Sequence, residues 1–103
     1  MLPKNREPTH PGEILLEEFL KPLGISQEEF AKHLGGSWTQ PKLSAIINKK
    51  RRVTEAIALD FADAFQTSPD FWINLQTKYD LWHAQKKHVS IKPLPEIDKE
   101  NVA

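Results

Sequence analysis

The chain has 103 residues, with 14 Lys or Arg against 14 Asp or Glu, so its formal net charge is zero. This length predicts a single domain with a modest core. The chain has no cysteine, which excludes disulfides and cysteine-ligated metal sites. A neutral chain has no general attraction to nucleic acid, so any argument for binding one depends on where the cations lie.

Residues 1–10 contain prolines and few apolar side chains, which indicates an N-terminal arm. They lack the apolar run of a signal peptide, and no later stretch is apolar for long enough to cross a bilayer. We therefore expect a cytoplasmic protein with no membrane partner.

The first helix is predicted to begin at Pro11 or Gly12 and to end at Lys21-Pro22, because proline disfavours the helical conformation in the residue before it. Its expected buried residues are Ile14, Leu15, Phe19 and Leu20.

The second helix begins at Ser26, which forms an S-x-x-E capping box with Glu29, and ends at Gly35-Gly36. A third helix is expected from about Gln40 to Asn48, with Thr39 or Gln40 as its N-cap. Its apolar positions, spaced i, i+3, i+4, are Leu43, Ile46 and Ile47.

Two further helices are predicted. Thr54 caps the fourth, and Ser68-Pro69 begins the fifth as a cap followed by a proline at the first helical position. The fold class is therefore all-α, with residues 11–87 as the domain. Residues 88–103 contain prolines and a short alternation of apolar side chains, which predicts an extended tail or a short strand.

Residues 26–48 have the layout of a helix-turn-helix. If the apolar side chains of the third helix face inward, its outer face presents Pro41, Ser44, Ala45 and Asn48, which are small or polar. Such a face fits the major groove, where Ser and Asn can bond base edges and phosphates. A block of consecutive cations follows and is expected to reach the flanking phosphates. The predicted DNA-binding residues are Gln27, Ser37, Thr39, Gln40, Lys42, Ser44, Asn48, Lys49, Lys50, Arg51 and Arg52.

Three motifs resemble the HigA-type antitoxins, which belong to the lambda-repressor-like (XRE) helix-turn-helix superfamily. They are HPGEIL at 10–15, FLKPLGISQ at 19–27 and SPDFWINLQTKYDL at 68–81. The resemblance spans about residues 9–82. It implies a five-helix lambda-repressor-like domain and a homodimer that binds a palindromic operator in double-stranded DNA. It also implies repression of its own operon and neutralisation of a HigB-type toxin, an mRNA endonuclease.

The chain departs from the family pattern at three places. The turn at residues 35–39 is longer than usual, and Pro41 stands where the family often has a polar base reader. Lys49 replaces the usual glycine at a bend that favours a positive φ. Trp38, on the longer turn, either fills a space in the core or contacts the sugar-phosphate edge.

The fifth helix carries more aromatic surface than one buried stripe requires, and aromatic side chains are common at the centres of interfaces. Trp72 is expected in the core. The predicted dimer interface comprises Phe71, Leu75, Tyr79 and Trp82.

Other classes of function remain as alternatives. His33, His83 and His88 have no metal-ligand spacing with nearby carboxylates, and no catalytic or cofactor motif is present, so we expect neither an enzyme nor a metal or cofactor site. Two alternatives to an antitoxin remain: a stand-alone repressor, and a protein-interaction adaptor whose helix-turn-helix no longer binds DNA. Exposed apolar side chains on the third helix would favour the adaptor.

Overall fold

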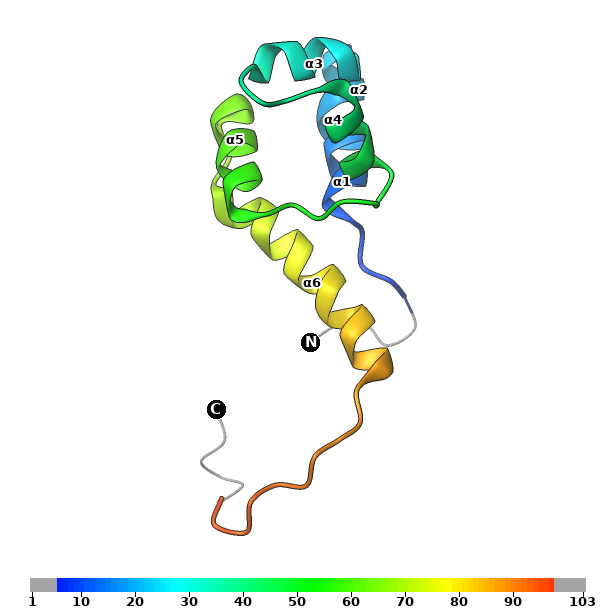
Figure 1. The fold of residues 1–103 in the computed structure, drawn as a ribbon, viewed down its shortest axis with the longest axis vertical. Helices are drawn as coiled ribbons and strands as arrows, with labels where there is room; N and C mark the ends of the chain where they lie inside the picture. Colours follow the sequence, from blue (N-terminus) through cyan, green and yellow to red (C-terminus); the bar gives the residue numbers. More distant parts are fainter. Residues whose placement is uncertain (1–5, 98–103) are drawn as a thin grey trace.

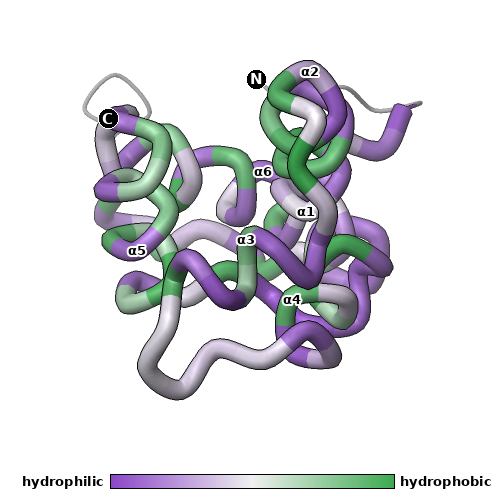
Figure 2. Tube along the Cα trace, turned by 90° about the horizontal axis from the view of Figure 1, so that it is seen from above, coloured by the Kyte–Doolittle hydropathy of each residue, from purple (hydrophilic) through white to green (hydrophobic). Residues whose placement is uncertain are grey.

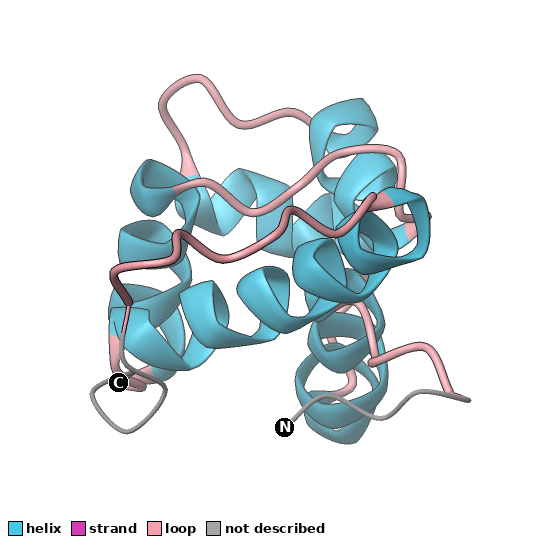
Figure 3. Ribbon diagram, turned by 90° about the horizontal axis from the view of Figure 1, so that it is seen from below, coloured by secondary structure: helices cyan, strands magenta, loops and turns pink. Residues whose placement is uncertain are grey.

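The structure, a computed structural model, describes residues 6–97, and these residues form helices and loops without a strand (Figures 1 and 3). The helices are α1 (Pro11–Ile14), η1 (Leu15–Leu20), α2 (Lys21–Leu23), α3 (Gln27–Leu34), α4 (Gln40–Ile47), α5 (Glu55–Phe65) and α6 (Pro69–Lys87). The first three are one continuous helical run, so the described residues hold the five helices that were predicted. No helix among them combines the length and the apolarity needed to cross a membrane.

The first helical run does not end where the sequence predicted. Lys21 has helical dihedral angles, and the run continues through Pro22 to Gly24, which ends it in the left-handed region at φ 67°. A proline within a helix has no N–H to donate, and its ring crowds the carbonyl four residues earlier. Here the residues before it form the wider π-helix η1, in which the Lys21 N–H donates to the carbonyl oxygen of Leu16. The wider π-helical turn accommodates Pro22. The prediction that the helix ends before Pro22 considered only the residue next to the proline, so it missed this turn.

The other helix starts follow the prediction because each rests on a local capping bond. The Ser26 hydroxyl accepts from the Glu29 N–H at 3.1 Å, and the Glu29 carboxylate accepts from the Ser26 N–H at 2.9 Å, which completes the capping box. Thr39, rather than Gln40, caps α4. Thr54 and Ser68 cap α5 and α6 as predicted.

The core is formed by residues of η1, α3, α4, α5 and α6, with Trp38 and Val53 from the loops between them. Figure 2 shows hydrophobic and hydrophilic residues alternating along the helices around it. Trp72 is fully buried, as predicted, with its ring 5.0 Å from that of Phe61 and its Nε1–H donating to the Thr67 hydroxyl at 2.9 Å. Through these contacts the Trp72 ring of α6 packs against the Phe61 and Phe65 rings of α5.

Helix α6 extends beyond the rest of the domain, and the chain continues from it as an extended segment (Figure 1). Residues 88–97 are exposed and contain one turn near their end, so the alternative of a short strand is not realised in this segment. The rest of the predicted tail, residues 98–103, and residues 1–5 of the predicted arm lie outside the described residues.

Helix α1 lies against α4 at Gly12. A Cβ atom placed on Gly12 would lie 1.9 Å from the carbonyl oxygen of Ile46 and 2.8 Å from the Cα of Ile47. The two backbones therefore touch, and only glycine fits at this position.

We expect Gly12→Ala to lower the free energy of unfolding by about 3 kcal/mol, the upper end for overpacking, because the obstructing atoms are backbone and cannot rotate away. Urea unfolding measures this. Gly24→Ala is the matched control: no atom lies within 4 Å of its Cβ, and only the positive φ of 67° opposes it. It should cost about 1 kcal/mol. Equal losses in the two variants would contradict the close approach.

Candidate nucleic-acid interface

Helix α4 presents the outer face that the sequence predicted. Leu43, Ile46 and Ile47 are buried against the core. On the opposite side Pro41 and Asn48 are exposed, and Ser44 and Ala45 are half-buried. The exposed face is therefore small and polar, without a large apolar side chain.

Two polar side chains of this face are already aligned with each other. The Asn48 side-chain amide donates to the Ser44 hydroxyl at 3.1 Å across one helical turn. Both keep further donor and acceptor capacity, so the pair can bond a ligand without first being ordered. The Thr39 hydroxyl caps α4 by accepting from the Lys42 N–H at 3.2 Å, and its own O–H remains available to donate. Gln40 is exposed in the first turn of α4, and Gln27 occupies the corresponding place in α3.

The long turn before α4 is held by Trp38. Its ring is buried, stacks on Phe61 with 5.6 Å between the centroids, and donates its Nε1–H to the Asp60 carboxylate at 2.8 Å. Of the two alternatives for Trp38, the structure shows the packing role. The Lys42 ammonium lies 4.2 Å from the centre of this ring, a cation–π contact that holds it beside the turn and near the exposed Ser37.

The block of cations after α4 divides into two pairs. Lys49 has a positive φ of 65°, as its place at a glycine position predicted, and its ammonium lies 3.9 Å from Glu13 and 4.0 Å from Glu7. Arg52 binds the Asp80 carboxylate at 3.0 Å.

Lys50 and Arg51 are exposed and form no ion pair with any residue between 6 and 97. The two central cations are therefore the ones whose charge faces solvent unopposed.

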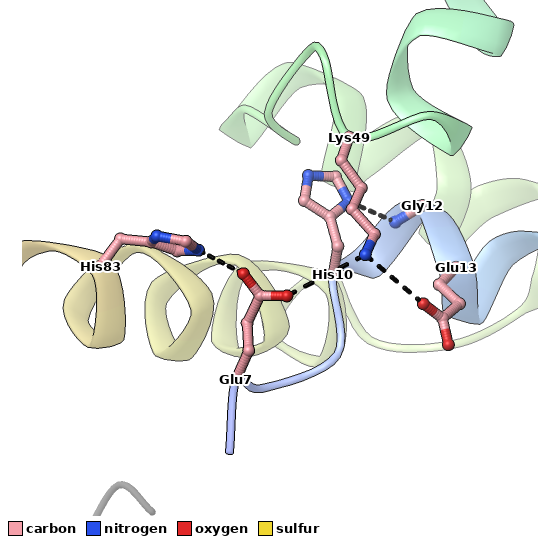
Figure 4. A network of polar contacts seen from close by, with 6 residues as sticks. All are labelled: Glu7, His10, Gly12, Glu13, Lys49 and His83. Carbon is pink, nitrogen blue, oxygen red and sulfur yellow. Dashed lines mark hydrogen bonds and ion pairs between the residues drawn. The ribbon is translucent and has the colours of Figure 1, made fainter. Parts of the chain in front are cut away.

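A polar network connects the N-terminal arm with the end of α4 and with α6 (Figure 4). The Glu7 carboxylate lies 2.6 Å from Nε2 of His83 and also faces Lys49. The buried His10 caps α1 by accepting from the Gly12 N–H on Nδ1 at 2.9 Å, and its ring lies edge-on to Tyr79 at 4.8 Å. Burial lowers the pKa of His10 because it disfavours the charged imidazole, and the charge of Lys49 lowers it further.

The sequence interpretation missed two residues that position the site. His10 was assigned only to a motif, although a polar residue directly before Pro-Gly at a helix start is a recognisable N-cap. Gln76 was likewise included only in a motif. It is buried, its Oε1 accepts from the Val53 N–H at 2.7 Å, and its Nε2 donates to Asp80 at 2.9 Å. Gln76 thereby fixes the segment that carries the cations to α6, and its i+4 spacing from Trp72 is the pattern that indicates an inward position.

The predicted dimer residues do not share one environment. Phe71 is 39% exposed, and Leu75 and Trp82 are half-buried. Tyr79 instead contacts His10 and lies 4.6 Å from the ring of His83, in the network beneath the arm. Burial raises the pKa of its hydroxyl, and the charge of Glu7 adds to this effect. We therefore leave Tyr79 out of the interface proposed below.

The fold and this site define the class of protein. The family model described as "Helix-turn-helix" matches residues 16–72, which includes α3, the turn and α4. The chain belongs to this family of DNA-binding regulators.

Individual relatives resemble the chain over most of its length. The HTH-type transcriptional regulator YbaQ of Escherichia coli is 39% identical over 93 residues, which cover 90% of this chain and 80% of that protein. PA4674 of Pseudomonas aeruginosa, solved in complex with its operator DNA, is 34% identical with a TM-score of 0.78, covering 87% of this chain and 100% of that one. The Pseudomonas aeruginosa antitoxin HigA, solved with the higBA promoter, is 34% identical with a TM-score of 0.76, covering 85% and 99%. The resemblance to HigA-type antitoxins is confirmed.

We expect Lys50→Ala and Arg51→Ala each to weaken binding to any duplex and to reduce the slope of log affinity against log salt by about 1, because each would lose one predicted phosphate contact. Arg52→Ala is the matched control, since Asp80 already binds that guanidinium. Fluorescence anisotropy over a series of salt concentrations measures the slopes. The same loss of slope in all three variants would contradict the division of the cation block.

The lowered pKa of His10 predicts a loss of stability in acid. Below the ordinary value of 6.5 the unfolded chain binds more protons than the folded one, so the free energy of unfolding decreases as the pH falls from 6.5 toward the lowered value. His10→Asn keeps a capping oxygen and cannot titrate. We expect it to be less stable than the parent at neutral pH but to lose less stability between about pH 7 and about pH 5. Parallel stability curves from urea unfolding would show that His10 does not contribute to the acid sensitivity.

Proposed function

We propose that the chain binds an operator duplex with α4 in the major groove. The observation that carries this proposal is the polar outer face of α4, with Ser44 and Asn48 aligned, beside the unopposed charges of Lys50 and Arg51. Two similar proteins have been solved with operator or promoter DNA, which supports it. The proposed DNA contacts are Gln27, Ser37, Thr39, Gln40, Lys42, Ser44, Asn48, Lys50 and Arg51. Lys49 and Arg52 are omitted because carboxylates within the chain already pair with them.

The proposed binding unit is a homodimer joined through α6. A two-fold axis allows two α4 helices to enter successive major grooves about 34 Å apart, and the operator is then palindromic. The partly exposed Phe71, Leu75 and Trp82 supply the interface. A dimer also doubles the number of phosphate contacts, which strengthens binding by a chain whose net charge is zero.

The proposed biological role is that of an antitoxin, which represses its own operon and neutralises a HigB-type toxin. The similarity to the antitoxin HigA over 85% of the chain supports this role. A stand-alone repressor is the second candidate. The adaptor without DNA binding is disfavoured, because α4 exposes polar side chains where an adaptor would expose apolar ones.

Fluorescence anisotropy with the duplex upstream of the gene, beside a scrambled duplex of equal composition, tests the DNA-binding proposal. We expect tighter binding to the native duplex, with two protomers per site and an affinity that falls steeply between about 50 and 200 mM salt. Equal affinity for the two duplexes would contradict an operator-specific role.

Co-expression with the neighbouring reading frame tests the antitoxin role separately. An antitoxin restores growth that the neighbouring product arrests. Growth unaffected by that product, together with specific operator binding, would instead identify a stand-alone repressor.

A further inference from the structure

The segment after α6 exposes an unusual amount of apolar surface. Within the described part of this segment, residues 88–97, Val89 is 82% exposed, Ile91 84%, Leu94 66% and Ile97 51%. In an extended chain, side chains two residues apart lie on the same side, as Val89 and Ile91 do. A contiguous apolar surface of this kind marks a binding segment rather than a solvated end.

A groove of complementary character lies between α3 and the end of α5. Its cavity is about 300 Å³, with apolar walls formed by Leu23, Phe30, Ala64 and Phe65. It continues past His33 into a second hollow of about 230 Å³, where Asp60 and Asp63 lie. The groove is therefore apolar at one end and acidic at the other.

The end of α6 and the segment after it carry an excess of cations, whereas the groove is lined by carboxylates. Residues 86–97 include Lys86, Lys87 and Lys92 against one carboxylate, Glu96. The groove has Asp60 and Asp63 at one end and Glu29 at the other, and α5 carries no Lys or Arg. On α3, His33 lies between the two hollows, and Lys32 lines neither of them. Charge complementarity sets the orientation in which a segment docks.

The position of α6 favours the groove of a second copy over the chain's own. Helix α6 has 19 residues and is thus about 28 Å long, and it carries the segment away from the groove (Figure 1). If two α6 helices pack antiparallel, each segment emerges beside the first turn of the partner's α6. The first turn of α6 contains Phe71, and the Phe71 ring lies 6.3 Å from the ring of Phe19. The Phe19 ring lies 4.5 Å from that of Phe65, which forms part of the groove wall.

We propose that residues 88–97 of each protomer occupy the groove between α3 and α5 of a second copy. Val89 and Ile91, which share one side of the extended segment, lie against its apolar walls, and Lys92 reaches Asp60 and Asp63 at the acidic end. The exchange rests on the α6 dimer of the proposed function. It would add a second contact between protomers, which fixes the distance between the two α4 helices.

Disulfide formation between protomers tests the exchange, because the chain has no cysteine of its own. Ile91→Cys and His33→Cys are made as separate full-length variants, refolded together and oxidised. We expect a covalent heterodimer on non-reducing gels. Glu55→Cys is the matched control for His33→Cys, since it is exposed on the first turn of α5, at the other end of that helix from Ala64 and Phe65.

The yield of heterodimer should be at least ten-fold higher with His33→Cys than with Glu55→Cys, and adding Asp63→Lys to the His33→Cys chain should reduce it several-fold. Equal yields would overturn the proposal. A double variant, Ile91→Cys with His33→Cys in one chain, that closes only an intramolecular disulfide would also overturn it, by showing that the segment folds back on its own domain. Operator preference of the unsubstituted chain is measured in parallel, so failure of the exchange is distinguishable from failure of DNA binding.

Discussion

The backbones of α1 and α4 touch at Gly12 and Ile46, and the orientation of α4 depends on that contact. The space between Gly12 and the Ile46 carbonyl is smaller than a methyl group, so the position of α4 relative to α1 is fixed by backbone atoms. His10 caps α1 immediately before this point and is buried there. Because Leu43, Ile46 and Ile47 are buried behind it, α4 has one orientation available, with Ser44, Ala45 and Asn48 on its outer side. The outward position of the candidate interface on α4 therefore follows from the burial of Leu43, Ile46 and Ile47 on the other side of that helix.

The distribution of charge explains how a neutral chain can present a basic site. Lys49 and Arg52 are balanced by carboxylates from the arm, from α1 and from α6, which leaves Lys50 and Arg51 between them facing solvent. Gln76 binds both the backbone after the cations and the Asp80 carboxylate that holds Arg52. The electrostatic potential near the end of α4 therefore depends on Lys50 and Arg51, which lack an ion-pair partner among residues 6–97. For this reason a net charge of zero over the whole chain does not exclude binding to a polyanion.

Much of the fold could be predicted from the sequence because its main features are local. The caps at Ser26, Thr54 and Ser68 each rest on a bond to a residue three positions later, and the positive φ of Lys49 follows from its place in a tight bend. The features that were missed depend on distant contacts. The first helical run continues through Pro22 because the π-helix η1 precedes it. The buried Gln76 bonds to Val53, which is 23 residues away in the sequence. Lys49 and Arg52 form ion pairs with carboxylates that are distant in the sequence. The sequence therefore predicted which side of α4 faces outward, because that depends on local periodicity. It did not predict the ion pairs of Lys49 and Arg52, because those depend on residues distant in the sequence.

We propose that α4 reads the base sequence, whereas the cations after it bind phosphate. Selection of preferred sites from randomised duplexes tests this directly, with the parent chain compared with Ser44→Ala, Gln40→Ala and Lys50→Ala. We expect at least one of the two α4 variants to change the preferred bases, whereas Lys50→Ala should weaken binding and leave the preference intact. An unchanged preference in both α4 variants would show that another part of the fold reads the sequence.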